Sequence, residues 1–286
     1  DHTHFHAAAM SMLLGKHVYL QKPMTHTIWE ARQLTLLARK KKVVTQMGNQ
    51  GTAEDGLRKG VEWIRAGTLG AVKSVHVWTN RPQWPQSPEV VARPQDRPAV
   101  PAEVDWEAFL GTAPTRAYHP SYHPFKWRGW LDFGTGALGD MGCHTANLPF
   151  MALELDHPTS IRAESEVPNR ETHTAWATVH YDFPARGKRG PLTFHWYEGK
   201  RPDGTKNLPP MDYFHGETPA SSGCLIVGEK GVLYGHLAKP NPQWKAPVVG
   251  DGLAVFLGPD AYVTPSWDAA KRETGKPQVD ISFPEI

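Results

Sequence analysis

The stretch HVYLQKPMTHTIWEARQLTLLARKKKVVTQM, residues 17–47, decides the fold class. It contains a short apolar run at 17–20, a helical pattern from Thr27 to about Lys41, and a second apolar run at 43–47. Thr27 and Glu30 match a capping box, in which both side chains satisfy backbone N–H groups at the start of a helix. The order strand, helix, strand predicts parallel strands joined by a helix.

The residues on both sides extend this pattern and then change it. Helical spacing at 5–14 and 53–66 ends at Gly15 and Gly67, while strands dominate after Gly70. We expect a short helix at 105–110 and a helical segment at 138–155, broken near Gly142. A longer strand is expected at 72–78. Short connections predict antiparallel pairing of the strands after residue 159, which are expected at 161–166, 175–183, 192–197, 224–227 and 232–234. We therefore predict an α/β chain with a parallel-sheet domain at 1–70 and an α+β domain at 71–286, which has a large, mostly antiparallel open sheet.

The composition excludes several classes of protein. The chain has 286 residues, 40% of them hydrophobic, and a formal net charge of +2. Its densest basic run, at 39–42, falls at the end of a predicted helix, so we expect no nucleic-acid partner. No apolar run reaches 18 residues, so we expect no membrane-spanning helix, and Cys143 and Cys224 do not form a disulfide framework. Asp1 does not resemble a natural start, so we expect an N-terminal cut, and the compartment, cytoplasmic or exported, stays open.

One glycine motif, GTGALG at 134–139, matches the dinucleotide-binding pattern G-x-G-x-x-G. No apolar strand precedes it. Asp140 follows it directly and puts a carboxylate where a pyrophosphate needs positive potential. We interpret the motif as a loop leading into a helix, so a phosphate-binding turn would have to lie before Asp1.

Two places carry side chains suited to chemistry. Lys22 follows the strand at 17–20 and precedes Pro23, at the strand end where parallel sheets bind ligands. Asp140 and His144 are four residues apart on a predicted helix, so both face the same side. This spacing suits a histidine base with an acidic neighbour, a metal pair, or a capping carboxylate beside a buried histidine.

Histidines near the N-terminus leave a second function open. His2 and His4 could join Asp140 and His144 in a metal-dependent hydrolase, although His2, His4 and His6 would not share one helix face. Another alternative is a catalytically silent fragment that binds glycans. On balance we expect no metal.

Taken in order, the motifs resemble the glucose–fructose oxidoreductase / inositol dehydrogenase (Gfo/Idh/MocA) family. They are DHTH at 1–4, GKHV at 15–18, KP at 22–23, TQMGNQ at 45–50, GTLGAV at 67–72 and GDMGCH at 139–144, with a GEKG turn at 228–231. The resemblance implies that residues 1–70 are the C-terminal half of a Rossmann domain without its glycine turn. Residues 71–286 would bind substrate and build a homo-oligomer, a dimer or tetramer, through the open sheet.

The resemblance also implies a reaction and its residues. Lys22 would hydrogen-bond the substrate hydroxyl, His144 would accept its proton, and Asp140 would be the acid beside them. The cofactor would be NAD or NADP, with NAD favoured, and the substrate a sugar, polyol or glycoside. An NAD-requiring glycosidase of the same family is the alternative. The residues expected to bind the cofactor are Asp1, His4, Gln21, Lys22, Asn49 and Gln50.

Two departures from the family pattern affect these expectations. Gln21 replaces the usual glutamate before the Lys-Pro step and removes a charge beside Lys22. The missing glycine turn predicts that this chain alone holds the cofactor weakly, and whether the chain alone turns over substrate stays open.

Two segments place an aromatic plane beside a guanidinium, an arrangement that suits a polyhydroxylated ring. They are NRPQWP at 80–85 and KWRGW at 126–130. Core packing is the alternative for each tryptophan. The expected substrate-binding residues are Asn80, Arg81, Trp84, Trp127 and Arg128.

Overall fold

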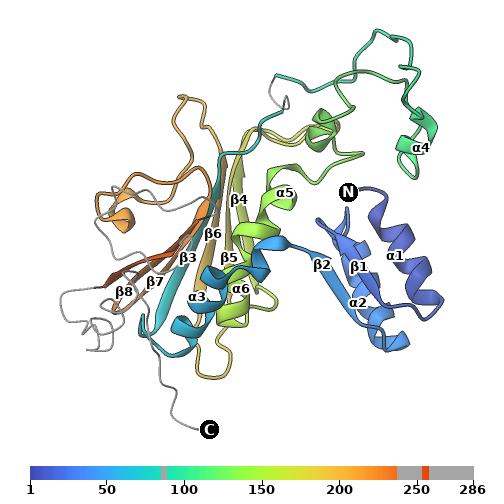
Figure 1. Ribbon diagram of the computed structural model, residues 1–286. Coiled ribbons are helices and arrows are strands. Elements are labelled where there is room, and N and C mark those ends of the chain that lie inside the picture. The colour runs from blue at the N-terminus through green and yellow to red at the C-terminus, as the bar shows by residue number, and fades with distance from the viewer. Residues whose placement is uncertain (85–88, 237–252, 258–286) are drawn as a thin grey trace, which may run out of the picture.

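The computed structural model describes residues 1–84, 89–236 and 253–257, which form a mixed α/β fold built on two sheets (Figure 1). The smaller sheet belongs to an N-terminal unit of α1 (His4–Leu13), β1 (Val18–Gln21), α2 (Ile28–Lys41) and β2 (Thr45–Gly48). β1 and β2 pair in parallel, and α1 packs against α2 around Ala8, Met12 and Leu34. The prediction of parallel strands joined by a helix is confirmed.

The capping box of α2 is also confirmed. The Thr27 hydroxyl accepts a hydrogen bond from the Glu30 amide at 3.2 Å, and the Glu30 carboxylate accepts one from the Thr27 amide at 2.9 Å. The helix ends at Lys42, which has a left-handed φ of 55°, and the preceding basic residues complement the negative end of the helix dipole.

The larger sheet has seven strands in the order β4-β5-β6-β3-β7-β8-β9. All neighbours pair antiparallel except β3 and β6, which are parallel. The mostly antiparallel open sheet is therefore confirmed. Its strands are β3 (Val72–Thr79), β4 (Ser160–Ser165), β5 (Trp176–Phe183), β6 (Leu192–Gly199), β7 (Gly223–Gly228), β8 (Gly231–His236) and β9 (Leu253–Leu257).

Helices cover the face of this sheet that points toward the N-terminal unit (Figure 1). They are α3 (Asp55–Arg65), α5 (Gly136–Thr145) and α6 (Asn147–Leu153), and a 3₁₀ turn, η1 (Gln50–Ala53), precedes α3. The buried side chains of Val75, Val77 and Trp196 belong to the hydrophobic core between the sheet and these helices. Because α3 packs on this sheet, the division between domains at residue 70 stays a prediction.

The helical segment predicted at 138–155 breaks at Ala146, not near Gly142 as expected. Pro149 lies in the first turn of α6, where its missing N–H costs nothing. A continuous helix would instead set its ring against the Thr145 carbonyl, which explains why α5 ends there.

The opposite face of the sheet carries a row of three histidines. His180, His195 and His76 are register partners on β5, β6 and β3. The rings of His76 and His195 stack at 4.5 Å, and the Nδ1 atoms of His180 and His195 are 2.6 Å apart. The 3₁₀ turn η3 (Met211–Phe214) covers the neighbouring part of this face, where Phe214 packs on Trp78.

Between β3 and α5 the chain makes a long excursion that includes α4 (Trp106–Leu110) and η2 (Lys126–Gly129). Its centre is a buried aromatic cluster that contains Tyr122, Trp130 and Phe133. The Arg116 guanidinium lies over these rings and forms an ion pair with Asp132. No helix of the described residues is both long and apolar enough to cross a bilayer.

Candidate active site

Lys22 and Asp140 form the centre of the candidate site. Lys22 follows β1 in the N-terminal unit, whereas Asp140 lies on α5 above the larger sheet. The lysine Nζ donates to the Asp140 Oδ1 at 2.8 Å and to the Asp140 backbone carbonyl at 2.9 Å. The side chains are 21% and 12% exposed, so the pair is largely shielded from water.

Two arginines approach the same carboxylate. The Nε of Arg81 is 3.7 Å from one Asp140 oxygen, and the Nε of Arg128 is 3.6 Å from the other. Arg81 follows β3, and Arg128 lies in η2. Three cations therefore surround one carboxylate, and they give the site an excess of positive charge that suits an oxygen-rich or anionic ligand.

His144 lies one helical turn beyond Asp140 on the same helix. Its Nδ1 is 2.9 Å from the side-chain oxygen of Asn49, which follows β2. Burial lowers the pKa of His144 below its ordinary 6.5, the charge of Lys22 lowers it further, and Asp140 opposes both effects. The imidazole is therefore neutral near neutral pH and can act as a base. Burial raises the pKa of the neighbouring Cys143 to about 11, so its thiol stays protonated.

The residues predicted to bind cofactor mostly contact other protein groups. Asp1 accepts hydrogen bonds from the Thr135 amide at 3.1 Å and hydroxyl at 2.8 Å, just before α5. The His4 Nδ1 donates to the Pro23 carbonyl at 2.6 Å, and the Gln21 side chain accepts from the Lys22 amide at 2.6 Å. Gln50 is exposed at the start of η1.

The predicted substrate-binding residues lie in two kinds of environment. Arg128 stacks on Trp127 at 4.3 Å, and Arg81 donates to the exposed Asn80 at 2.6 Å. Trp84 is buried, 5% exposed, with its ring packed edge-on against Phe125. The structure thus brings both arginines to Asp140 and places Trp84 in a packed interior.

The glycine motif at 134–139 has a packing role. A Cβ on Gly134 would lie 2.4 Å from the Arg128 carbonyl oxygen, so no larger residue fits there. Gly136 has a φ of +62°, and a Cβ on it would meet the His173 ring at 2.8 Å. The motif leads directly into α5, as interpreted from the sequence.

The histidines of the hydrolase hypothesis do not converge on Asp140 and His144. The His2 Nε2 donates to the Phe109 carbonyl at 2.9 Å, and His4 donates to Pro23. Among the described residues, no three histidine, cysteine, aspartate or glutamate side chains form a group suited to a metal ion. This geometry does not support the hydrolase.

A buried carboxyl group in the larger sheet was not predicted from the sequence. Glu198 ends β6, pairs in register with Thr79 of β3, and is 5% exposed. Burial raises the pKa of Glu198 to about 7, and the hydrogen bond from the Trp196 indole N–H at 2.7 Å opposes that shift. A glutamate within an alternating strand carries no signal in the sequence that it is buried.

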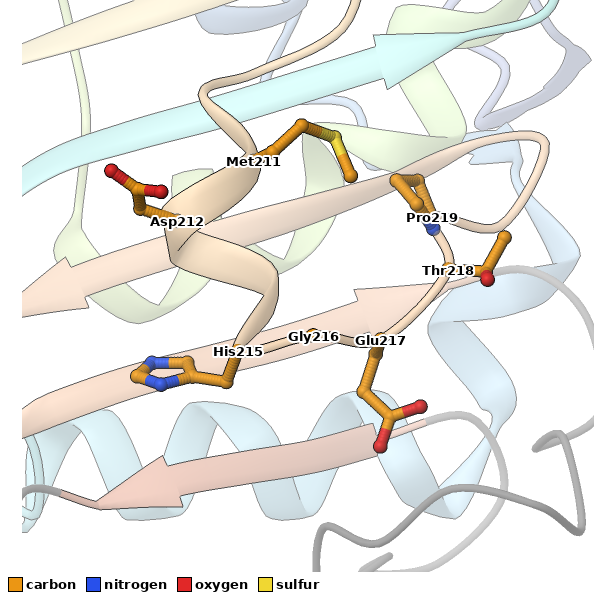
Figure 2. A pocket seen from close by; sticks show the side chains of 7 residues that line it. All are labelled: Met211, Asp212, His215, Gly216, Glu217, Thr218 and Pro219. Atoms are coloured by element: carbon orange, nitrogen blue, oxygen red, sulfur yellow. The ribbon is translucent and has the colours of Figure 1, made fainter.

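A separate pocket of about 600 Å³ lies on the other side of the larger sheet, at η3 and the loop after it. Figure 2 shows that the polar side chains of His215 and Glu217 point in different directions and do not converge. The apolar side chain of Met211 points toward Pro219. The pocket lies away from Lys22 and Asp140, and we assign it no part in the chemistry.

Comparisons with known proteins agree with the fold. The family model "Oxidoreductase family, C-terminal alpha/beta domain" matches residues 75–188. An uncharacterized oxidoreductase from Synechocystis sp. is 26% identical over 241 residues, which are 74% of this chain and 54% of that protein. A second family model, named "Putative FMN-binding domain", matches residues 221–280. The strands of this chain within that range, β7, β8 and β9, belong to the same sheet as β3.

Solved structures resemble the whole described fold. An inositol dehydrogenase homolog from Azotobacter vinelandii, complexed with NAD+, superposes with a TM-score of 0.55 at 16% identity and covers 92% of this chain. An aldose–aldose oxidoreductase from Caulobacter crescentus, complexed with glycerol, gives 0.51 at 15% identity and covers 89%. The chain spans 58% and 57% of those two proteins, so it covers little more than half of their length. Residues 75–188 thus match a model for the C-terminal domain of the Gfo/Idh/MocA oxidoreductases, and the curated relative and the solved structures agree with that similarity.

Proposed function

We propose that the chain carries the reacting groups of an NAD(P)-dependent oxidoreductase that moves a hydride to or from a hydroxyl-bearing carbon of a sugar, polyol or glycoside. The observation that supports it most is the Lys22–Asp140 contact, which joins the N-terminal unit to α5 beside His144. Relatives add support through the names they carry, an inositol dehydrogenase homolog and an aldose–aldose oxidoreductase.

In this proposal, different residues of the chain accept the proton and stabilise the developing charge. In the oxidation direction, neutral His144 accepts the proton of the substrate hydroxyl as the O–H bond breaks. The Lys22 ammonium stabilises the negative charge that develops on that oxygen. Asp140 holds Lys22 in place and balances part of the surrounding positive charge. A bound nicotinamide would supply the acceptor for the hydride.

The reacting end of the site fits such a cofactor, whereas the described residues show no cradle for its phosphates. Lys22 and the carboxyl ends of β1 and β2 form the sheet edge where parallel sheets bind ligands. The glycines at 134–139 are packed against protein atoms instead. We therefore expect this chain to bind the whole dinucleotide more weakly than a protein with a glycine turn, because the phosphates lack their binding loop.

The arginines suggest the substrate class. Arg81 and Arg128 each have part of their guanidinium directed at Asp140 and are 27% exposed, so further N–H groups can reach neighbouring hydroxyls. Trp127 beneath Arg128 adds a flat apolar surface. A homo-oligomer through the open face of the larger sheet also belongs to this proposal.

The test measures NADH production by the chain with NAD+ and a panel of inositols, aldoses and glycosides. Lys22→Met and His144→Asn should each lower kcat/KM by about 10²–10⁴-fold, the usual effect of losing a charge-stabilising group or a general base.

The matched controls are Lys16→Met and His6→Asn, which change an exposed lysine and an exposed histidine of the same N-terminal unit. Both controls should retain the wild-type rate. Unchanged turnover in the Lys22 and His144 variants would remove these residues from the reaction, and no NADH from any substrate would count against the proposed function itself.

A further inference from the structure

Asn49 lies at a position where its side-chain amide touches two consecutive residues of α5. It follows β2 and is buried, 9% exposed. Its Nδ2 donates to the Cys143 carbonyl, and its Oδ1 is 2.9 Å from the Nδ1 of His144. Asn49 therefore connects the N-terminal unit to the predicted base.

The Cys143 carbonyl fixes which way this amide points. Cys143 lies in the last turn of α5, where carbonyl oxygens lack a partner N–H within the helix. A carbonyl oxygen only accepts hydrogen bonds, so the NH₂ group of Asn49 must face it. The side-chain oxygen of Asn49 is then left facing His144.

That oxygen in turn determines which nitrogen of His144 carries hydrogen. The Oδ1 of Asn49 only accepts, so the Nδ1 of His144 must donate. A neutral imidazole has one N–H, which leaves Nε2 with a free lone pair. Burial and the charge of Lys22 favour the neutral ring, while Asp140 is the facing group that favours the charged one.

We propose that Asn49 is a positioning residue that selects the Nδ1-protonated tautomer of His144 and thereby leaves Nε2 able to accept a proton. The part played by Nε2 in catalysis rests on the proposed function, whereas the tautomer itself does not. Asn49 was expected from the sequence to bind cofactor; the contacts described here give it a different task.

The test reads the tautomer directly from the ring-nitrogen chemical shifts of His144, by NMR of the ¹⁵N-labelled chain without cofactor or substrate. His144→Asn identifies the signals. In the wild type, Nδ1 should be protonated and Nε2 unprotonated. Asn49→Ala should shift the population toward Nε2–H, the form that free imidazole side chains prefer in water. Asn49→Asp should keep Nδ1–H, since a carboxylate also accepts, and should raise the pKa of His144.

Asn147→Ala is the matched control, because the Asn147 amide donates to the Thr52 hydroxyl at 2.7 Å and so joins α6 to η1, next to the Asn49 contact. It should leave the His144 signals unchanged. An Nε2–H tautomer in the wild type, or an unchanged Nδ1–H tautomer in Asn49→Ala, would overturn the proposal. If Asn49→Ala does not fold, loss of Nδ1–H in Asn49→Asp would overturn it equally. Absent turnover would count against the proposed function alone.

Discussion

Replacing His76 with glutamine should make the stability of the chain less sensitive to acid. His76 is 4% exposed in the centre of the larger sheet, with Nδ1 3.0 Å from the Tyr197 hydroxyl and Nε2 3.0 Å from the Ser74 hydroxyl. Burial, followed by the neighbouring His195 and His180, lowers the pKa of His76 from 6.5 to about 3. Glutamine retains polar atoms for the hydroxyls but does not titrate.

The direction of this pH effect follows from the number of protons that the folded and the unfolded chain bind. Below about pH 6.5 the unfolded chain protonates His76 while the folded chain does not, so acid favours unfolding. The free energy of unfolding should therefore fall as the pH drops from 6.5 toward 3. Between about pH 7 and about pH 5, the titration of His76 should lower the free energy of unfolding of the wild type by about 2 kcal/mol.

The assay is urea denaturation followed by tryptophan fluorescence at both pH values, at constant ionic strength. The quantity compared is the change in the free energy of unfolding between the two pH values. It should be about 2 kcal/mol smaller in His76→Gln than in the wild type. Ser74→Ala is the control, because it removes one hydrogen-bond partner but keeps the titrating ring, and its pH dependence should match the wild type. Equal pH dependence in His76→Gln and the wild type would refute the reasoning.

Three further variants test buried and partly buried charges. Asp140→Asn should lower the free energy of unfolding by about 2–3 kcal/mol, because it leaves three partly buried cations without their carboxylate, whereas Arg128→Gln should cost less than about 1 kcal/mol. Equal losses in the two variants would contradict this picture. Glu198→Gln should stabilise the chain by about 3 kcal/mol at about pH 8, because the folded pKa of about 7 lies above the ordinary 4.5 and stability is lost as the pH rises through that range. The same urea assay at about pH 5 should show little difference, and a destabilised variant at the higher pH would show that the folded protein does not raise the pKa of Glu198.

Local features of the sequence predicted much of the fold. The capping box at Thr27 and Glu30 forms as expected because it depends only on residues three apart. The predicted strands lie within a residue or two of their observed ends, but the strand β9 (Leu253–Leu257) was not predicted. The helix break was predicted near Gly142 because glycine disfavours helix, but it lies at Ala146. The ring of Pro149 would clash with the backbone of a continuous helix, and this clash sets the position of the break.

Contacts between distant residues could not be read in the same way. Lys22, Asp140 and His144 were named through a family resemblance, but the approach of Arg81 and Arg128 to one carboxylate depends on how η2 and the end of β3 meet α5. The parallel pairing of β3 with β6 likewise joins strands with a long excursion between them. Asn49 and Glu198 carry no local pattern that reveals their partners.

The contact between Lys22 and Asp140 has a consequence for how the proposed activity could be controlled. One residue belongs to the unit around β1 and β2 and the other to the helix layer over the larger sheet. Neither unit alone contains an assembled reaction centre. If the proposed reaction takes place there, it depends on the interface: a small rotation between the units would move Lys22 away from Asp140 and His144, which stay together on α5, and would act as an on–off control.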